Sequence, residues 1–205
     1  MTILQAESAT AICQRALGWA EHRNTFDSLE DASQLARECR LRYDIRRRAV
    51  LEGLDWRFAR RRRAAQAVEA DATPPEYPFA WARPPEHLRI RGMFAATSRT
   101  PLRHVIEDVI YTAEGGPLQV VFTYDASNPA LFPPVFTTAL EFLLASEFAM
   151  LYARSVNRAE IMLANFRRAM EEADATEAAE RSEDEAYACG SWVDAIQTPW
   201  FGGYA

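Results

Sequence analysis

Proline is distributed very unevenly along this chain, and its distribution limits where helices can form. Ten of the 11 prolines lie between Thr73 and Pro134. Proline interrupts a helix interior because it lacks the N–H donor and its ring clashes with the preceding turn. We therefore expect helices on both sides of this segment and β structure within it. The predicted fold class is α+β, a mainly helical bundle that carries a small inserted antiparallel β subdomain.

The first third of the chain has apolar residues at helical spacing. One helix is predicted from the recurrence of Ile12, Cys13, Ala16 and Leu17. Ser28 with Asp31 three residues later is typical of a helix N-cap. From there, the apolar pattern predicts a long helix that ends at about Leu54.

The proline-rich segment contains short stretches in which apolar and polar residues alternate, as in a half-buried strand. They lie around Leu88 and Ile90 and from Leu118 to Tyr124. Gly115 and Gly116 precede the second stretch and predict a hairpin turn that pairs it with residues 109–112. The expected division is a helical core of residues 1–72 and 134–189 around a β subdomain of residues 73–133. Deleting most of this insert is expected to spare the bundle.

Residues 135–153 are apolar enough to suggest a membrane span, but they include Glu141 and Glu147. A charge at mid-bilayer costs roughly 2.5–3.5 kcal/mol on insertion scales, so we expect a buried central helix and no membrane partner. Asn157 with Glu160 predicts the N-cap of another helix. Its buried stripe is expected to contain Met162, Phe166, Ala169, Met170 and Ala173.

Catalytic and metal-binding patterns are missing from the sequence. The three histidines are isolated, the three cysteines form no CxxC pair, and no nucleophile or phosphate-binding motif occurs. We expect a protein that is not an enzyme, with no metal and no cofactor. The first ten residues lack the basic and apolar regions of a signal peptide, which favours synthesis in a reducing cytoplasm.

Charge is concentrated in two segments of opposite sign. From Arg37 to Arg63 there are 11 arginines and four acids, and from Glu171 to Glu185 there are eight acids and one arginine. The basic stretch could neutralise nucleic-acid phosphates, or it could contact the acidic helix of a neighbouring copy. The residues predicted for an inter-subunit or partner interface are Arg40, Arg46, Arg47, Arg48, Glu171, Glu172, Glu177 and Glu180.

Several short motifs resemble the tail tubular protein A family, the head-to-tail adaptors of short-tailed phages. Trp56-Arg57-Phe58-Ala59 is similar to the motif that ends the family's long helix. Residues before and after this motif also resemble the family's pattern: Leu17-Gly18, Ser28-Leu29, Tyr43, Val50-Leu51, Tyr77 to Trp81, Pro84 to Arg89, Tyr124, Pro134, Phe136, Ala139, Leu140, Leu143 and Gly190-Ser191-Trp192. Arg83 and His87 depart from the pattern, since the family more often has leucine and cysteine there.

The resemblance implies a structural virion protein, assembled in the host cytoplasm and located below the portal vertex. It implies a ring of about twelve copies between the portal protein and a downstream tail or nozzle protein, with DNA passing through the channel without sequence-specific binding. Trp56, Phe58, Phe136 and Leu140 are expected to form its core motif. Replacing Arg46, Arg47 and Arg48 by glutamine should then weaken ring formation while leaving the monomer's melting temperature nearly unchanged. The alternative is a helical DNA-binding or packaging-regulatory protein that uses the stretch from Arg37 to Arg63.

The C-terminal segment, residues 190–205, is short and rich in aromatic and glycine residues. Its four large aromatic residues are Trp192, Trp200, Phe201 and Tyr204. Two interpretations remain open: the segment packs back on the bundle near Trp192, or it docks into pockets of the portal or of an adjacent subunit.

Overall fold

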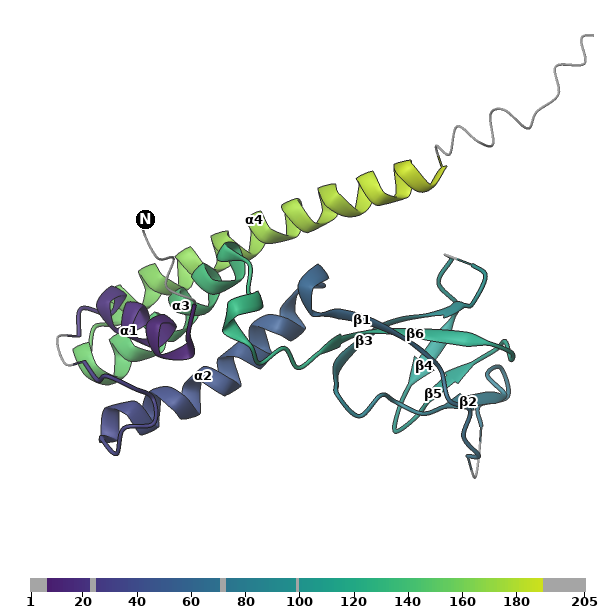
Figure 1. The fold of residues 1–205 in the computed structure, drawn as a ribbon, viewed down its shortest axis with the longest axis horizontal. Coiled ribbons are helices and arrows are strands. Elements are labelled where there is room, and N and C mark those ends of the chain that lie inside the picture. The colour runs from purple at the N-terminus through teal and green to yellow at the C-terminus, as the bar shows by residue number, and fades with distance from the viewer. Residues whose placement is uncertain (1–6, 23–24, 71–72, 99, 190–205) are drawn as a thin grey trace, which may run out of the picture.

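The computed structural model describes residues 7–22, 25–70, 73–98 and 100–189, with side chains to residue 179. Its helices are α1 (Ala9–Trp19), α2 (Gln34–Gly53), α3 (Pro134–Phe148) and α4 (Val156–Cys189). The strands are β1 (Arg60–Ala64), β2 (Phe79–Trp81), β3 (His87–Ala95), β4 (His104–Ile106), β5 (Ile110–Thr112) and β6 (Leu118–Tyr124). Figure 1 shows α1, α2 and α3 gathered at one end of the molecule and the strands at the other, with α4 extending from the helical end toward the strands. The predicted α+β class is confirmed.

α3 lies at the centre of the helical part and packs against α1, α2 and α4. Its buried side chains face all three neighbours, which explains why the segment is apolar nearly all round. Pro134–Ala153 is long and apolar enough to cross a membrane, yet more than half of the span is buried inside the protein. Its carboxylate Glu141 accepts from Arg15 Nε at 2.6 Å and from Trp19 Nε1 at 3.3 Å.

Both N-caps predicted for the longer helices are displaced by a few residues. α2 begins after Ser33, whose hydroxyl accepts from the Ala36 N–H, so Ser28 is not its cap. The Asp31 carboxylate instead accepts from the Ser28 N–H and closes a separate turn. α4 is capped by Ser155, which accepts from the Arg158 N–H, and not by Asn157.

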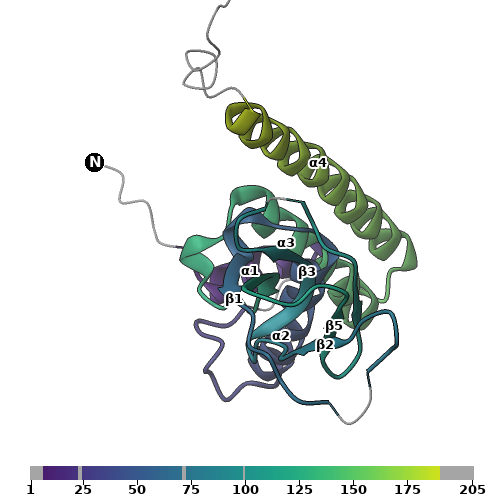
Figure 2. The same ribbon diagram turned by 90° about the vertical axis from the view of Figure 1, so that its right-hand side faces the viewer.

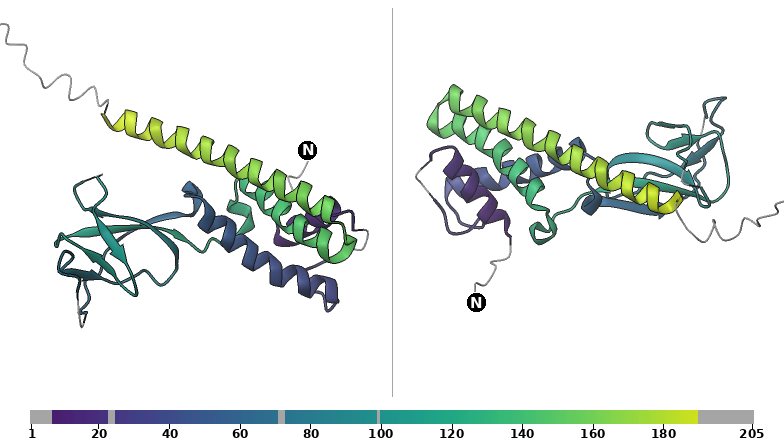
Figure 3. Two further views of the ribbon diagram at one scale, coloured as in Figure 1. Left: turned by 180° about the vertical axis from the view of Figure 1, so that it is seen from behind. Right: turned by 90° about the horizontal axis from the view of Figure 1, so that it is seen from above.

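α4 is 34 residues long, or about 51 Å at 1.5 Å per residue. Its stripe predicted from the sequence does face the core: Met162, Ala169 and Ala173 are buried, and Phe166 packs against the same cluster. The far end of the helix continues past the other helices (Figures 1 and 3). α4 is therefore partly a core helix and partly a projecting arm.

The β subdomain consists of two antiparallel sheets of three strands, in the orders β1-β6-β3 and β2-β5-β4. The predicted hairpin is wrong, because β5 and β6 belong to different sheets and Gly116, at φ +110°, lies in the connection between them. The first strand also lies outside the predicted insert, since β1 starts at Arg60 and pairs with β6. Figure 2 views the molecule from this end.

Each part has its own apolar core, and Leu88 and Tyr124 of the strands also pack against the helical core. Polar contacts join the two parts as well. Arg91 of β3 donates through Nη2 to the carbonyl oxygens of Leu51, Glu52 and Leu54 at the end of α2, at 3.2, 3.1 and 2.5 Å. Arg89 adds a bond to the Glu52 carbonyl at 2.9 Å. The last carbonyls of a helix lack partners within it, so the β subdomain supplies the C-terminal cap of α2.

Candidate protein–protein interface

The aromatic motif expected from the sequence lies in the helical core. Trp56, Phe136 and Leu140 are fully buried, and Phe58 packs against them. The Phe136 ring meets Trp56 and Phe58 edge-on, with centroids 5.1 Å apart in both pairs. The Trp56 Nε1–H donates to the Val50 carbonyl at 2.8 Å. These residues position the end of α2, and Phe58 is the one of the four that is only partly buried.

Arg47 was predicted at an interface, but its side chain is only 2% exposed. Its guanidinium pairs with Asp125, donates to the Ala126 carbonyl and approaches Asp44. An arginine placed this way cannot contact another molecule without unfolding its surroundings. We therefore expect the replacement of Arg46, Arg47 and Arg48 together to lower the monomer's melting temperature, in contrast to the nearly unchanged value expected from the sequence.

The other predicted arginines of α2 also have carboxylate partners within the chain. Arg40 pairs with Glu30 at 3.0 Å, Arg48 pairs with Asp125 at 2.9 Å, and Arg46 pairs with Glu147. These three guanidinium groups remain partly exposed, so they can still contribute to a contact. Their attraction for an external anion is reduced because each already has a negative partner.

The arginines of β1 lie on an exposed edge strand. Arg61 and Arg63 pair with Glu86 at 3.7 and 2.5 Å, and the Arg61 guanidinium lies 3.6 Å from the centre of the Tyr124 ring. Charged residues on an edge strand oppose pairing with strands of other molecules. The basic stretch from Arg37 to Arg63 is thus divided between two elements and largely compensated by carboxylates.

The four predicted acidic residues of α4 occupy different environments. Glu171 and Glu172 are exposed. Glu177 is nearly buried and accepts from the backbone N–H of Arg57 at 3.2 Å, so it belongs to the fold. Glu180 lies on the helix, but its side chain is outside the described part. The docking segment with Trp192, Trp200, Phe201 and Tyr204 also lies outside the described residues.

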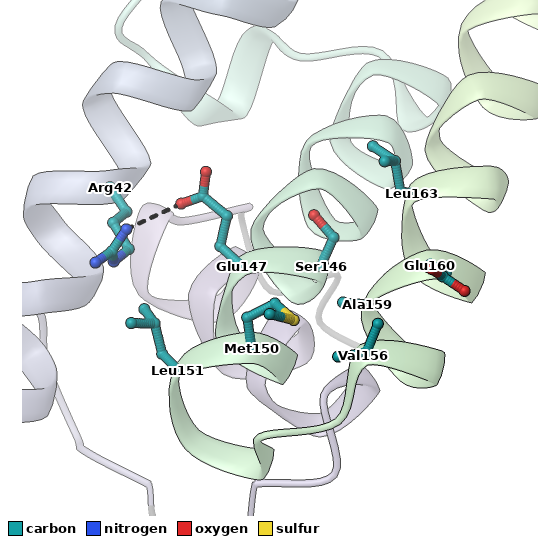
Figure 4. Close-up of a pocket in the computed structure, with 9 residues that line it drawn as sticks. All are labelled: Arg42, Ser146, Glu147, Met150, Leu151, Val156, Ala159, Glu160 and Leu163. Atoms are coloured by element: carbon teal, nitrogen blue, oxygen red, sulfur yellow. Dashed lines mark hydrogen bonds and ion pairs between the residues drawn. The ribbon is translucent and has the colours of Figure 1, made fainter.

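An apolar groove between α2 and α4 was not foreseen from the sequence. It has a volume of about 450 Å³ and is lined by Arg42, Ser146, Glu147, Met150, Leu151, Val156, Ala159, Glu160 and Leu163. Figure 4 shows that these residues come from α2, the end of α3, the π-helical turn Ala149–Ala153 and the start of α4. The lining is mainly aliphatic.

The chain reversal between α3 and α4 explains why apolar side chains are exposed at the groove. The π-helical turn places Met150 outward at 50% exposure, and Val156, after the reversal, is 57% exposed. Arg154 between them has a left-handed backbone, at φ 49°. Both a π-turn and a non-glycine residue at positive φ are costly conformations that often occur at functional sites. The groove is therefore a candidate binding surface.

α2 exposes a second apolar pair one turn apart. Leu41 is 66% exposed and Ile45 is 53% exposed, with Arg40 and Arg48 nearby on the same helix. An apolar centre with a charged rim is the arrangement found in protein–protein interfaces. Leu41 and Ile45 belong to the apolar pattern that predicts the long helix, and that pattern does not by itself show which of its residues are exposed.

Within residues 7–22, 25–70, 73–98 and 100–189, no group of three or more His, Cys, Asp or Glu side chains could hold a metal ion. Searches with the sequence found no matching protein-family model and no similar curated protein.

Proposed function

We propose that this chain is a structural virion protein of a tailed phage or phage-derived particle: a head-to-tail adaptor that assembles as a ring between portal and tail. The observation that carries the proposal is the projecting part of α4, which leaves the bundle as an acidic helix. The part of α4 beyond the buried Glu177 runs from residue 178 to Cys189, and an isolated helix of about a dozen residues is only marginally stable in water. Its stability is best explained by packing against other subunits in an assembly.

The exposed apolar pair on α2 supports the same proposal. Leu41 and Ile45 offer an apolar centre, and Arg40 and Arg48 at its edge have the sign that would attract Glu171 and Glu172 of a neighbouring α4. Exposed ion pairs each contribute only about 0–1 kcal/mol, but a ring repeats each of them at every subunit. We expect assembly to weaken as the salt concentration rises.

The alternative proposal is a helical DNA-binding or packaging-regulatory protein. Its candidate surface is the basic stretch, in which Arg40, Arg46, Arg48, Arg61 and Arg63 already pair with carboxylates. Binding of DNA would have to displace these pairs. This compensation favours the adaptor over the DNA-binding protein.

Mixing the full chain with the portal protein of the same particle tests the adaptor proposal. Electron microscopy should show a ring of chains seated on the portal ring. The variant Leu41→Gln with Ile45→Gln should lose the ring, whereas Ile106→Gln in β4, also exposed in the structure, should keep it. A chain that never associates with the portal contradicts the proposal.

Binding to random duplex DNA tests the alternative. A DNA-binding protein that makes 6–10 phosphate contacts loses about 10³–10⁵ in affinity between about 50 and 200 mM salt. We expect weak binding with a shallow salt dependence. Tight binding with a steep slope, together with no portal association, would favour the regulatory function.

A further inference from the structure

The groove of Figure 4 has features of a built binding site. Its volume of about 450 Å³ falls within the range of roughly 300–1,000 Å³ typical of pockets that bury a small ligand. Aliphatic side chains line it, including Met150, Leu151, Val156 and Leu163. Such a lining suits an apolar or aromatic anchor. The one cation among the lining residues, Arg42, pairs with Glu147 at 3.2 Å, and Glu160 adds a second carboxylate, so the groove does not favour a phosphate.

The chain itself contains anchors of this kind. Trp200 and Phe201 are adjacent in the sequence and lie 11 and 12 residues beyond Cys189, where α4 ends. Buried tryptophan residues are enriched among the side chains that dominate the affinity of protein interfaces.

The length of α4 separates these anchors from the groove of their own chain. Leu163 precedes Cys189 by 26 residues, which is about 39 Å along a straight helix. Val156 lies seven residues farther back, about 10 Å more at the same rise. From Cys189 to Trp200 a fully extended chain spans at most about 36–40 Å. Trp200 therefore reaches the near side of its own groove only with the chain fully extended, and does not reach Val156.

We propose that the groove binds the Trp200-Phe201 segment of a neighbouring copy of this chain. The inference rests on the proposed ring, and it names the contact that would link adjacent subunits. Each subunit offers one groove and one anchor, so the contact is head-to-tail and can close into a ring.

A double-mutant cycle on the full-length chain tests the contact. The groove variant is Met150→Gln with Leu151→Gln, both exposed positions whose replacement should leave the fold intact. The anchor variant is Trp200→Ala with Phe201→Ala. Each should raise the Kd of self-association, measured by analytical ultracentrifugation, by at least about tenfold. The variant that combines all four changes should have a Kd of self-association no higher than the higher of the two, because both pairs of changes remove the same contact.

Mixing the two variants shows whether the contact is between chains. The anchor variant keeps its groove and the groove variant keeps its anchor, so an equal mixture should form heterodimers through the one groove–anchor contact that neither variant can form alone. The controls are Leu131→Gln, which is exposed away from the groove, and Gln197→Ala. Both should leave self-association unchanged.

Three outcomes would overturn the inference: additive effects in the cycle, no heterodimer in the mixture, or loss of portal binding with self-association unchanged. The last outcome would indicate that the Trp200-Phe201 segment binds the portal protein and not a neighbouring copy, and it would be consistent with the adaptor proposal. Failure of the chain to join the portal ring, in contrast, would contradict the adaptor proposal whatever the cycle shows.

Discussion

The guanidinium of Arg47 donates a hydrogen bond to the backbone carbonyl oxygen of Ala126 across 2.6 Å. This bond connects the middle of α2 to the residues that follow β6. The same guanidinium pairs with Asp125. A buried charge is tolerated only when it is paired and hydrogen-bonded, so the helical part depends on residues that the sequence assigns to the insert. Deleting residues 73–133 would remove both partners and should unfold the bundle.

Replacing Arg47 by Gln should lower the free energy of unfolding by about 3 kcal/mol, the lower end of the range expected for removing one partner of a buried ion pair. Urea denaturation followed by circular dichroism would measure the change. The matched control is Arg40→Gln, whose pair with Glu30 is exposed and should contribute no more than about 1 kcal/mol. Equal effects of the two substitutions would contradict the structural role of Arg47.

Replacing Arg91 by Lys should loosen the end of α2. The lysine ammonium keeps the charge, but it lacks the planar fork that allows one arginine to bond several carbonyls. We expect a loss of about 1–3 kcal/mol and faster hydrogen exchange in the last turn of α2. Arg62→Lys on the exposed strand β1 should leave that exchange unchanged. Identical exchange in both variants would show that the cap is not needed.

Replacing Phe136 by Ala should cost about 3–5 kcal/mol, as for other large-to-small changes in a core. It removes the ring on which Trp56, Phe58 and Phe132 converge. The near-ultraviolet circular dichroism of the aromatic cluster should weaken at the same time. Leu131→Ala, at an exposed position, should stay within about 0.5 kcal/mol of the parent protein.

Stability should decrease at alkaline pH. Burial raises the pKa of the Tyr43 hydroxyl, and the side-chain hydrogen bond with Cys39 together with burial raises the pKa of the Cys13 thiol. The unfolded chain therefore releases these protons first, at about pH 8.5 for cysteine and about pH 10 for tyrosine. The same hydrogen bond lowers the pKa of the Cys39 thiol, so one of the two thiols ionises in the folded protein and offsets part of this effect. The free energy of unfolding should decrease as the pH rises above about 8.5, through Cys13, and further above about 10, through Tyr43.

The variant Tyr43→Phe isolates one part of this pH dependence. Among the described residues the Tyr43 hydroxyl has no hydrogen-bond partner, so the substitution should not destabilise the protein at pH 7. It should make the decrease above about pH 10 shallower, because the phenol no longer titrates in the unfolded chain. An unchanged alkaline slope would show that Tyr43 does not contribute to it.

The elements that follow from apolar periodicity could be predicted from the sequence. α1, the buried face of α4 and the strands β3 and β6 occur where the pattern placed them. The first residue of each helix was harder to predict from the sequence. Ser28 and Ser33 both precede helix-compatible residues, and only tertiary packing determines which of the two serves as the N-cap of α2. β1 gave no signal at all, since a run of four arginines has no apolar alternation.

The surface was harder to predict than the core. Arg47 and Asp125 are 78 residues apart, and ion pairs between distant segments leave no periodic pattern in the sequence. The groove depends on a π-helical turn and on Arg154 at positive φ. Neither conformation is specified by a recognisable local motif. The prediction of one regular, buried helix over residues 135–153 therefore did not indicate that Met150 and Leu151 are exposed.

The cap that Arg89 and Arg91 place on α2 also determines how the molecule responds to mechanical load. A force applied to the β subdomain reaches the helices partly through hydrogen bonds to the carbonyls of Leu51, Glu52 and Leu54. The Arg47 bonds and the packing of Leu88 and Tyr124 against the helical core carry the rest. Water can replace such bonds one at a time at modest cost. Under tension the subdomain should therefore swivel about the end of α2 while both cores stay folded, and it should return when the tension is released.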